Sequence, residues 1–364
     1  MIGIDEKALR VTWTVFLFSL LLAIVYFIRE TLLVFAGAIF FAYILSPIVG
    51  VIEHFVRKQR TVALALVYVV FLGALVGLGF ALIPRLAQEA TSLFTRLPAL
   101  VMNGGWAKIP LPSWATPVHD QIMDALKNWA SGLEKQAVPF IQEAGAGIVS
   151  GVSSLVPMIL VPILAFFFLK DARQIRTGML SMAHGASRTT LRQIFDDVHT
   201  MLQSYIRALV ILAAASFLAW LIFLNILGEP YALLLSGIAG TLEFIPVIGP
   251  AAALVVILIV TSATGGMGSL IWIIVFWLLY RVFQDYVLNP FLMSSGVEIH
   301  PILVLFGVLA GEKLGGIPGM FFSVPILAIL KVVLTNLARA SSERESGAAD
   351  QDSLTLGWSA KPDK

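Results

Sequence analysis

One carboxylate, Glu243, stands alone inside an apolar stretch, three residues before a Pro/Gly break that contains Pro246, Gly249 and Pro250. A charged side chain at the centre of a bilayer costs on the order of 3 kcal/mol on insertion scales, so its presence requires a reason. Glu243 is therefore interpreted as an acceptor for a proton or a cation. The alternatives are a structural ion pair with Arg207 or Arg281, or a position at the outer membrane surface.

The break itself is a second source of polar chemistry. Pro246 and Pro250 end helical hydrogen bonding, and Gly249 permits a tight turn. Backbone groups released in this way are tolerated at membrane depth only when they face protein or a water-filled cavity. The break is thus expected to contact a polar solute, and the alternative is a hairpin tip that only packs.

Four polar residues further along the chain are spaced as on one helical face: Arg281, Gln284, Asp285 and Asn289. Such a face inside an apolar span is expected to look into the protein. Arg281 and Asp285 are four residues apart, so they could pair with each other. The alternative is that they form a gate or an anion site.

A second Pro/Gly break, GEKLGGIPG at 311–319, contains Glu312, Gly315 and Gly316. We expect 231–260 and 299–334 to be related hairpins that approach a common site from opposite membrane faces, with Glu243 and Glu312 as their acidic members. His300 nearby is too isolated to indicate a metal site, and no metal is expected.

Composition identifies the elements that must position these residues. The chain of 364 residues is 59% hydrophobic and 13% charged, with a mean hydropathy of +0.91. This is typical of an integral membrane protein. The predicted fold is all-α, with about eight transmembrane helices, including broken or re-entrant hairpins, and an external amphipathic helical segment.

The expected organisation follows hydropathy and charge along the chain. Three N-terminal spans occupy 1–83, an external segment 84–151, a fourth span 152–169, cytoplasmic amphipathic helices 170–207, a C-terminal core with broken hairpins 208–338, and a disordered tail 339–364. Basic residues beside the first two spans and after the fourth place both termini in the cytoplasm. The segment 231–260 is predicted to form either a re-entrant hairpin or two short spans.

Several function classes are disfavoured. The sequence contains no P-loop, zinc-protease or nucleophile-elbow motif, so we expect no enzyme and no cofactor. A net charge of +2 predicts no nucleic-acid partner. The expected partners are the lipid bilayer, a small polar solute or cation, and further copies of the chain, because Gly73, Gly77 and Gly79 favour close helix packing.

Two C-terminal stretches carry a family resemblance: LGEPYALLLSGIAGTLEFIPVIGP at 227–250, and QDYVLNPFLMSSGVEIHPILVLFGVLAGEKLGGIPGMFFSVPILAIL at 284–330. The chain resembles the autoinducer-2 exporter family of bacterial permeases in its Pro-x-Ile-Gly-Pro break and its Gly-rich turn leading to a Val-Pro. The resemblance implies a multi-spanning permease of the bacterial inner membrane. Some relatives are described as exporters of a furanone signal, and others are linked to sodium/proton exchange.

The expected function is therefore export of a small polar solute through a path lined by the broken helices. The alternatives are a cation/proton antiporter and an oligomeric membrane scaffold that transports nothing.

Overall fold

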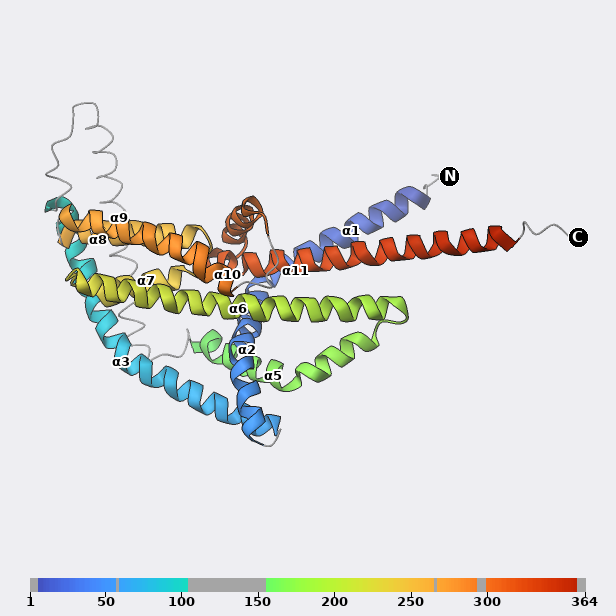
Figure 1. Ribbon diagram of the computed structural model, residues 1–364, viewed down its shortest axis with the longest axis horizontal. Coiled ribbons are helices and arrows are strands. Elements are labelled where there is room, and N and C mark those ends of the chain that lie inside the picture. Colours follow the sequence, from blue (N-terminus) through green and yellow to red (C-terminus); the bar gives the residue numbers. More distant parts are fainter. Residues whose placement is uncertain (1–5, 57–58, 104–154, 265–266, 293–298, 359–364) are drawn as a thin grey trace, which may run out of the picture.

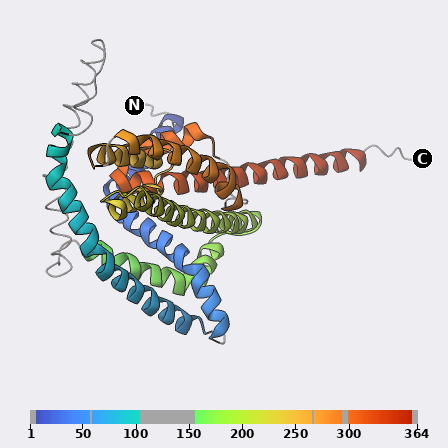
Figure 2. The same ribbon diagram turned by 60° about the vertical axis from the view of Figure 1, so that its left-hand side comes forward.

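The computed structural model describes residues 6–56, 59–103, 155–264, 267–292 and 299–358, and within these residues it is helical without strands. Six described helices are long and apolar enough to cross a membrane, and two shorter apolar helices accompany them. This confirms the predicted all-α membrane architecture. Helices α6, α7, α8 and α9 run in similar directions, α2 and α3 run across them, and α1 and the end of α11 extend outward (Figures 1 and 2).

The first helices form a subdomain around α2. Helix α1 (Glu6–Phe27) is exposed along its length, as expected of a lipid-facing span, and the next helix begins two residues later. Helix α2 (Arg29–Phe55) packs on α3 (Arg60–Asn103) and α5 (Leu155–Ser181) through a buried apolar cluster that includes Leu45, Leu64 and Ala165.

Helix α3 is longer than the sequence predicts. It continues through Pro84, where the external segment was expected to begin, and ends at Asn103. The part of the expected external segment up to Asn103 therefore belongs to the same helix as the third span, and Leu93 is buried in the core beside α7 and α8. The second amphipathic helix expected within 122–144 lies outside the described residues.

The amphipathic helices expected over 170–207 are continuous with the spans on either side of them. Helix α5 continues to Ser181, and α6 (Ala186–Ile226) joins the amphipathic stretch to the fifth span in one helix of 41 residues. No proline or glycine occurs within 186–226, so the sequence contains no residue of these types that would end the helix before the fifth span. Pro157 lies in the first turn of α5, where proline is tolerated, and Pro162 is internal.

The broken segment 231–260 forms two short helices, α7 (Ala232–Leu242) and α8 (Ile248–Thr264). They pack with α6 and with α9 (Met267–Phe283) around a buried cluster that includes Trp220, Leu235 and Ile257. Contact between α7 and α6 is close, because a Cβ at Gly240 would lie 2.8 Å from the Cβ of Phe217. The alternatives of re-entrant hairpin and short spans both remain predictions.

After α9 the chain forms a π-helical turn (Gln284–Leu288) and the short helix α10 (Asn289–Leu292). Helix α11 (Pro301–Trp358) is bent back on itself at Gly315 and Gly316, where the backbone is not helical. The two arms run side by side, because a Cβ at Gly311 would lie 2.3 Å from the carbonyl oxygen of Gly319. The predicted second hairpin is thus present.

The polar tail 339–364 was expected to be disordered. The structure instead continues α11 to Trp358, consistent with the helix-favouring Ala, Glu, Arg and Leu residues of that stretch. In Figure 1 this extension projects at the same end of the bundle as the turn between α5 and α6. A cytoplasmic location of that end stays a prediction.

Candidate functional site

The break between α7 and α8 is a compact turn whose backbone groups are largely paired within it. Leu242 accepts a hydrogen bond from the Ile245 amide (2.9 Å), and Ile245 accepts one from the Gly249 amide (2.9 Å). Pro246 accepts one from Ile248 (2.7 Å). This differs from the expectation that free backbone groups serve the solute, so the side chains at the turn carry most of its available polar chemistry.

Two features of the turn depend on backbone conformation. Val247 has a φ of +67°, a left-handed conformation that is strained for a β-branched residue. A Cβ at Gly249 would lie 1.8 Å from the carbonyl oxygen of Leu242, so only glycine fits there. Pro250 follows in the first turn of α8, where its missing amide hydrogen is not needed.

Glu243 lies at the C-terminal end of α7 and is buried, with 6% of its side chain exposed. Its Oε1 accepts a short hydrogen bond from Nε2 of Gln284 and lies 3.7 Å from Nη1 of Arg281. Of the two predicted partners, Arg281 is therefore the one that pairs with Glu243. Arg207 is exposed on α6 and is not among the residues that line the cavity described below.

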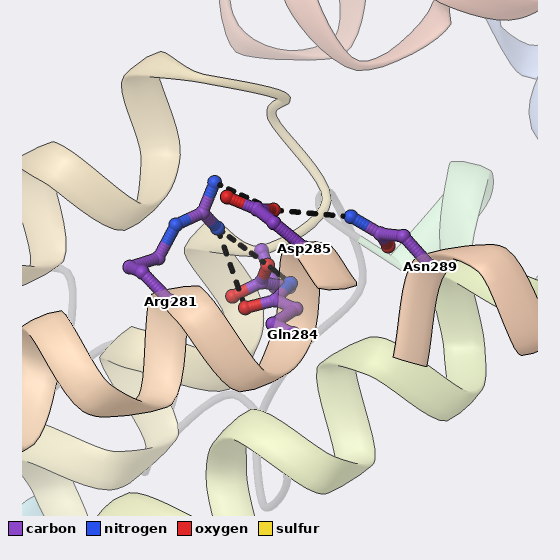
Figure 3. Close-up of polar contacts among 5 residues, drawn as sticks. Arg281, Gln284, Asp285 and Asn289 are labelled. Atoms are coloured by element: carbon purple, nitrogen blue, oxygen red, sulfur yellow. Dashed lines mark hydrogen bonds and ion pairs between the residues drawn. The ribbon is translucent and has the colours of Figure 1, made fainter. Parts of the chain in front are cut away.

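The polar face predicted on 281–289 forms a connected network (Figure 3). Arg281 donates to Oε1 of Gln284 (3.3 Å) and pairs with Oδ1 of Asp285 (3.4 Å). Asn289 donates to the same Asp285 oxygen (3.2 Å). Arg281 thus bridges the two carboxylates, Glu243 and Asp285, and the structure contains both of the ion pairs that the sequence left as alternatives.

The π-helical turn places part of this network. Its backbone hydrogen bonds join residues five apart, where those of an α-helix join residues four apart. The Asn289 amide accordingly donates to the Gln284 carbonyl. Gln284 is 2% exposed and Asp285 is 46% exposed at its side chain. The turn therefore directs neighbouring polar groups to different depths, and such turns are frequent at functional sites.

The network borders a cavity of about 360 Å³, within the size range of small-molecule sites. Its polar side is formed by Glu243, Arg281, Gln284, Asp285 and Asn289, with Pro246, Val247 and Pro250 from the break. Its other walls come from α6, from the arms of α11 and from Ile299: Met201, Ser204, Tyr205, Leu209, Leu212, Val304, Val324 and Ala328. The site is therefore mostly apolar, with one polar side.

The acidic residue of the second break, Glu312, does not line this cavity. Glu312 pairs with Lys313 at 3.1 Å, and both side chains are exposed, at 45% and 82%. Gly315 faces Leu33 of α2, and Gly316 turns with a φ of +60°. The arms of this hairpin line the cavity, while its predicted site residues Glu312, Gly315 and Gly316 lie away from it.

Sequence reasoning missed the contribution of α6. Tyr205 was not among the candidate residues, yet it lines the cavity, and its hydroxyl is buried without a partner in the described part of the chain. The unpaired Oδ1 of Asn289 is a second such group.

The other end of the α7–α8 pair is anchored by two carboxylates that the sequence did not single out. Glu89 of α3 accepts a hydrogen bond from the Leu234 amide (2.9 Å) in the first turn of α7, which satisfies a helix N-terminus. Glu229, before α7, accepts one from Oγ1 of Thr264 (2.9 Å) at the end of α8. Burial raises the pKa of Glu229 above its ordinary value, and the Thr264 hydrogen bond partly offsets this effect.

Among the described residues, no three His, Cys, Asp or Glu side chains gather as metal ligands would. The residues that do gather are an acid, an amide and a guanidinium, which suit hydrogen bonding to a solute or transfer of a proton.

Comparison with known proteins places these features in a family. The profile of AI-2E family transporters matches residues 15–339. YueF of Bacillus subtilis, provisionally named a transport protein, is 24% identical over 93% of this chain and 96% of its own length. YrrI of the same organism, named likewise, is 27% identical over 84% and 86%. PerM of Escherichia coli, provisionally named a permease, is 27% identical over 85% and 88%. The chain therefore belongs to the AI-2E family of transporters, as the resemblance of its two broken segments predicts.

Proposed function

We propose that the protein is a permease of the bacterial inner membrane that exports a small polar solute through the cavity beside Glu243. Membership of a transporter family supports a transport function, and the cavity is the candidate site for the solute. The solute expected by resemblance to the family is a furanone signal of the autoinducer-2 type. The distribution of basic residues supports a cytoplasmic location for both termini.

The observation that carries the proposal is the buried Glu243–Gln284–Arg281 network at a helix break that opens on a cavity. Broken helices near the membrane midplane are the usual location of solute sites in secondary transporters. An intramembrane acid that faces such a cavity is a functional candidate by default. The apolar wall from α6 and α11 suits the carbon skeleton of a small solute, and the polar wall suits its oxygens.

Cation/proton exchange is the second candidate function, because Glu243 and Asp285 place two carboxylates around one guanidinium. Protonation of either acid would change the charge beside the cavity. A non-transporting scaffold is the third candidate, and nothing in the described part of the chain requires it.

Flux measurements with purified protein in liposomes test these functions. The assay follows uptake of an isotopically labelled furanone signal under imposed pH and sodium gradients, in wild type, Glu243→Gln and the control Glu312→Gln. We expect flux in wild type and in Glu312→Gln and a large loss in Glu243→Gln.

Three results would overturn one or more of these functions. Absence of furanone flux under every gradient, with proton or sodium movement intact, would replace export by exchange. Absence of all flux would favour the scaffold. Equal furanone flux in the two variants would remove Glu243 from the path.

A further inference from the structure

The charges on the wall of the main cavity do not cancel. Among the lining residues that the structure describes, three carry a formal charge: the carboxylates of Glu243 and Asp285 and the guanidinium of Arg281. Nη1 of Arg281 lies 3.7 Å from Oε1 of Glu243, and Nη2 lies 3.4 Å from Oδ1 of Asp285 (Figure 3). The wall therefore has one surplus negative charge when both acids are ionised, and it is neutral when one of them is protonated.

The donors of Arg281 are directed at the protein itself. Its Nη1 group donates to Oε1 of Gln284 (3.3 Å) and also faces Glu243, while its Nη2 group pairs with Asp285. A guanidinium binds a carboxylate or a phosphate best when two of its nitrogens form a paired contact with the anion. Arg281 is therefore poorly placed to receive an anionic solute.

The polar side of the cavity offers acceptors instead. Asp285 has the most exposed side chain of the three charged residues, at 46%. Asn289 donates to Asp285, and its own Oδ1 has no partner within the described residues. Carboxylate and amide oxygens accept hydrogen bonds. A solute that donates, through a hydroxyl or an ammonium group, matches this side of the cavity.

The other walls supply no compensating cation. They are mostly apolar, and the arginine and the lysine that lie within three residues of a lining residue on α6 and α11, Arg207 and Lys331, are exposed and do not line the cavity. An anion that entered would lose its hydration without gaining a positive partner in exchange. The cavity is thus expected to disfavour anions.

We propose that the cavity selects against anionic solutes and binds uncharged or cationic solutes whose hydroxyl or ammonium groups donate to Asp285 and Asn289. Asp285 sets the charge preference, because it supplies the second acid beside a single guanidinium. This inference rests on the proposed function, since it takes the cavity as the solute site, and it adds the chemical class of the solute.

The sign of the charge in the cavity is measured by the rate at which charged reagents modify a cysteine on its wall. Val324→Cys introduces one thiol into a sequence that contains no cysteine. The purified full-length protein is treated with a trimethylammonium-bearing and a sulfonate-bearing methanethiosulfonate of similar size. The ratio of the two rates is divided by the same ratio for 2-mercaptoethanol. We expect the normalised ratio to favour the cation by about fivefold or more at low salt and to fall as salt is added.

Two further substitutions, each made in the Val324→Cys protein, form a matched pair. Asp285→Asn removes the surplus charge and keeps the shape of the side chain, so the normalised ratio is expected to fall to about 1. Glu312→Gln removes an exposed acid that does not line the cavity and is expected to leave the ratio unchanged. The proposal is overturned by an unchanged ratio in Asp285→Asn, by faster reaction with the sulfonate, or by no modification with either reagent.

Protection of the same thiol tests the class of solute. Erythritol, ethanolamine and the anion erythronate are each added at the same concentration at neutral pH, and modification by uncharged methyl methanethiosulfonate is followed. We expect erythritol and ethanolamine to slow the reaction and erythronate to leave it unchanged. Protection by erythronate, or its absence with both other compounds, overturns the proposal. These readouts need no transport, so a protein without flux would refute the proposed function and leave the measured charge preference intact.

Discussion

The two broken hairpins of this protein are built from the same residue types and occupy opposite environments. Each has prolines, glycines and one acid inside an apolar stretch. The first turns at 243–247, where Glu243 and Ile245 are buried and Val247 is exposed, and the turn shares a cavity with α6, α9 and the arms of α11. The second turns at Gly315 and Gly316, where most of the neighbouring residues are exposed.

This difference separates two roles that the residue pattern alone does not distinguish. Glu243 is surrounded by Arg281 and Gln284 from another helix, whereas Glu312 pairs with its own neighbour, Lys313. A Pro/Gly break allows the chain to turn, and the covering elements decide whether the turn forms a site. The second hairpin contributes to the site through its arms, at Val304, Val324 and Ala328.

The largest expected effect is at the inner turn. Gly249→Ala would bring a Cβ within 1.8 Å of a backbone oxygen, which cannot rotate away as a side chain can. We expect a loss of about 3 kcal/mol or more of folding stability, or failure to fold. Thermal unfolding and the yield of monodisperse protein measure it.

Gly73→Ala on α3 is the control for this substitution, because nothing lies within 4 Å of its added Cβ. It is expected to be neutral or slightly stabilising, since alanine favours helix over glycine. Equal stability of the two variants would contradict the described turn.

The next effect compares the two acids. Glu243→Ala removes the acceptor of the buried Gln284 amide and one of the two carboxylates beside Arg281, which keeps its pair with Asp285. We expect a loss of about 1–3 kcal/mol, because a buried donor is left unsatisfied. Glu312→Ala breaks an exposed pair and should cost less than about 0.5 kcal/mol. Thermal unfolding of both variants decides, and similar small losses would mean that the two breaks are equivalent.

A smaller effect of opposite sign is expected at Val247. Its left-handed φ costs about 1–3 kcal/mol, and glycine removes that strain at an entropic cost of about 0.5–1 kcal/mol. Val247→Gly is therefore expected to raise stability by roughly 1 kcal/mol in thermal unfolding, within a range of about 0–2.5 kcal/mol. Val255→Gly, in the middle of α8 and similarly exposed, should instead lower it by about 0.4 kcal/mol. A loss in both variants would contradict the strained turn.

The smallest expected effect concerns the far end of the first hairpin. The pKa of Glu229 is raised by burial, so the folded protein binds its proton more tightly than the unfolded chain does. The contribution of this group is complete below its ordinary pKa and decreases as pH rises through the raised value. Glu229→Gln should flatten that part of the Tm-against-pH curve. An unchanged curve would show that Glu229 is not desolvated there.

The sequence predicted those parts of the site that depend on local chemistry. Prolines and glycines mark breaks wherever they occur in an apolar span, and an isolated acid such as Glu243 is visible because burial of charge is costly. The face shared by Arg281, Gln284 and Asp285 follows from helical spacing. The short helices α7 and α8 and the hydrogen-bonded network contain the predicted break and the shared polar face, and a role of these residues in transport stays a prediction.

The parts that were missed depend on packing between distant segments. Tyr205 faces the cavity because α6 is continuous through 186–226, and Arg207, two residues later, points to another side of the same helix. The π-turn after Phe283 shifts the register of the polar face by one residue. No residue type in the sequence predicts such a turn. The rotation of the helices relative to one another likewise decides which arginine pairs with Glu243. Spacing along the sequence does not predict that rotation.

If the cavity beside Glu243 is the solute path, a bulky group attached to its wall should block solute flux. The sequence contains no cysteine, so a single introduced cysteine can carry that group. Val324 lines the cavity and Val332 belongs to a packed cluster on the same helix, and both are buried. Each is changed to Cys, treated with a small charged thiol reagent in liposomes, and assayed for flux. We predict that Val324→Cys is modified and its flux falls to that of protein-free liposomes, while Val332→Cys and wild type are unaffected. Full flux in modified Val324→Cys would contradict the account.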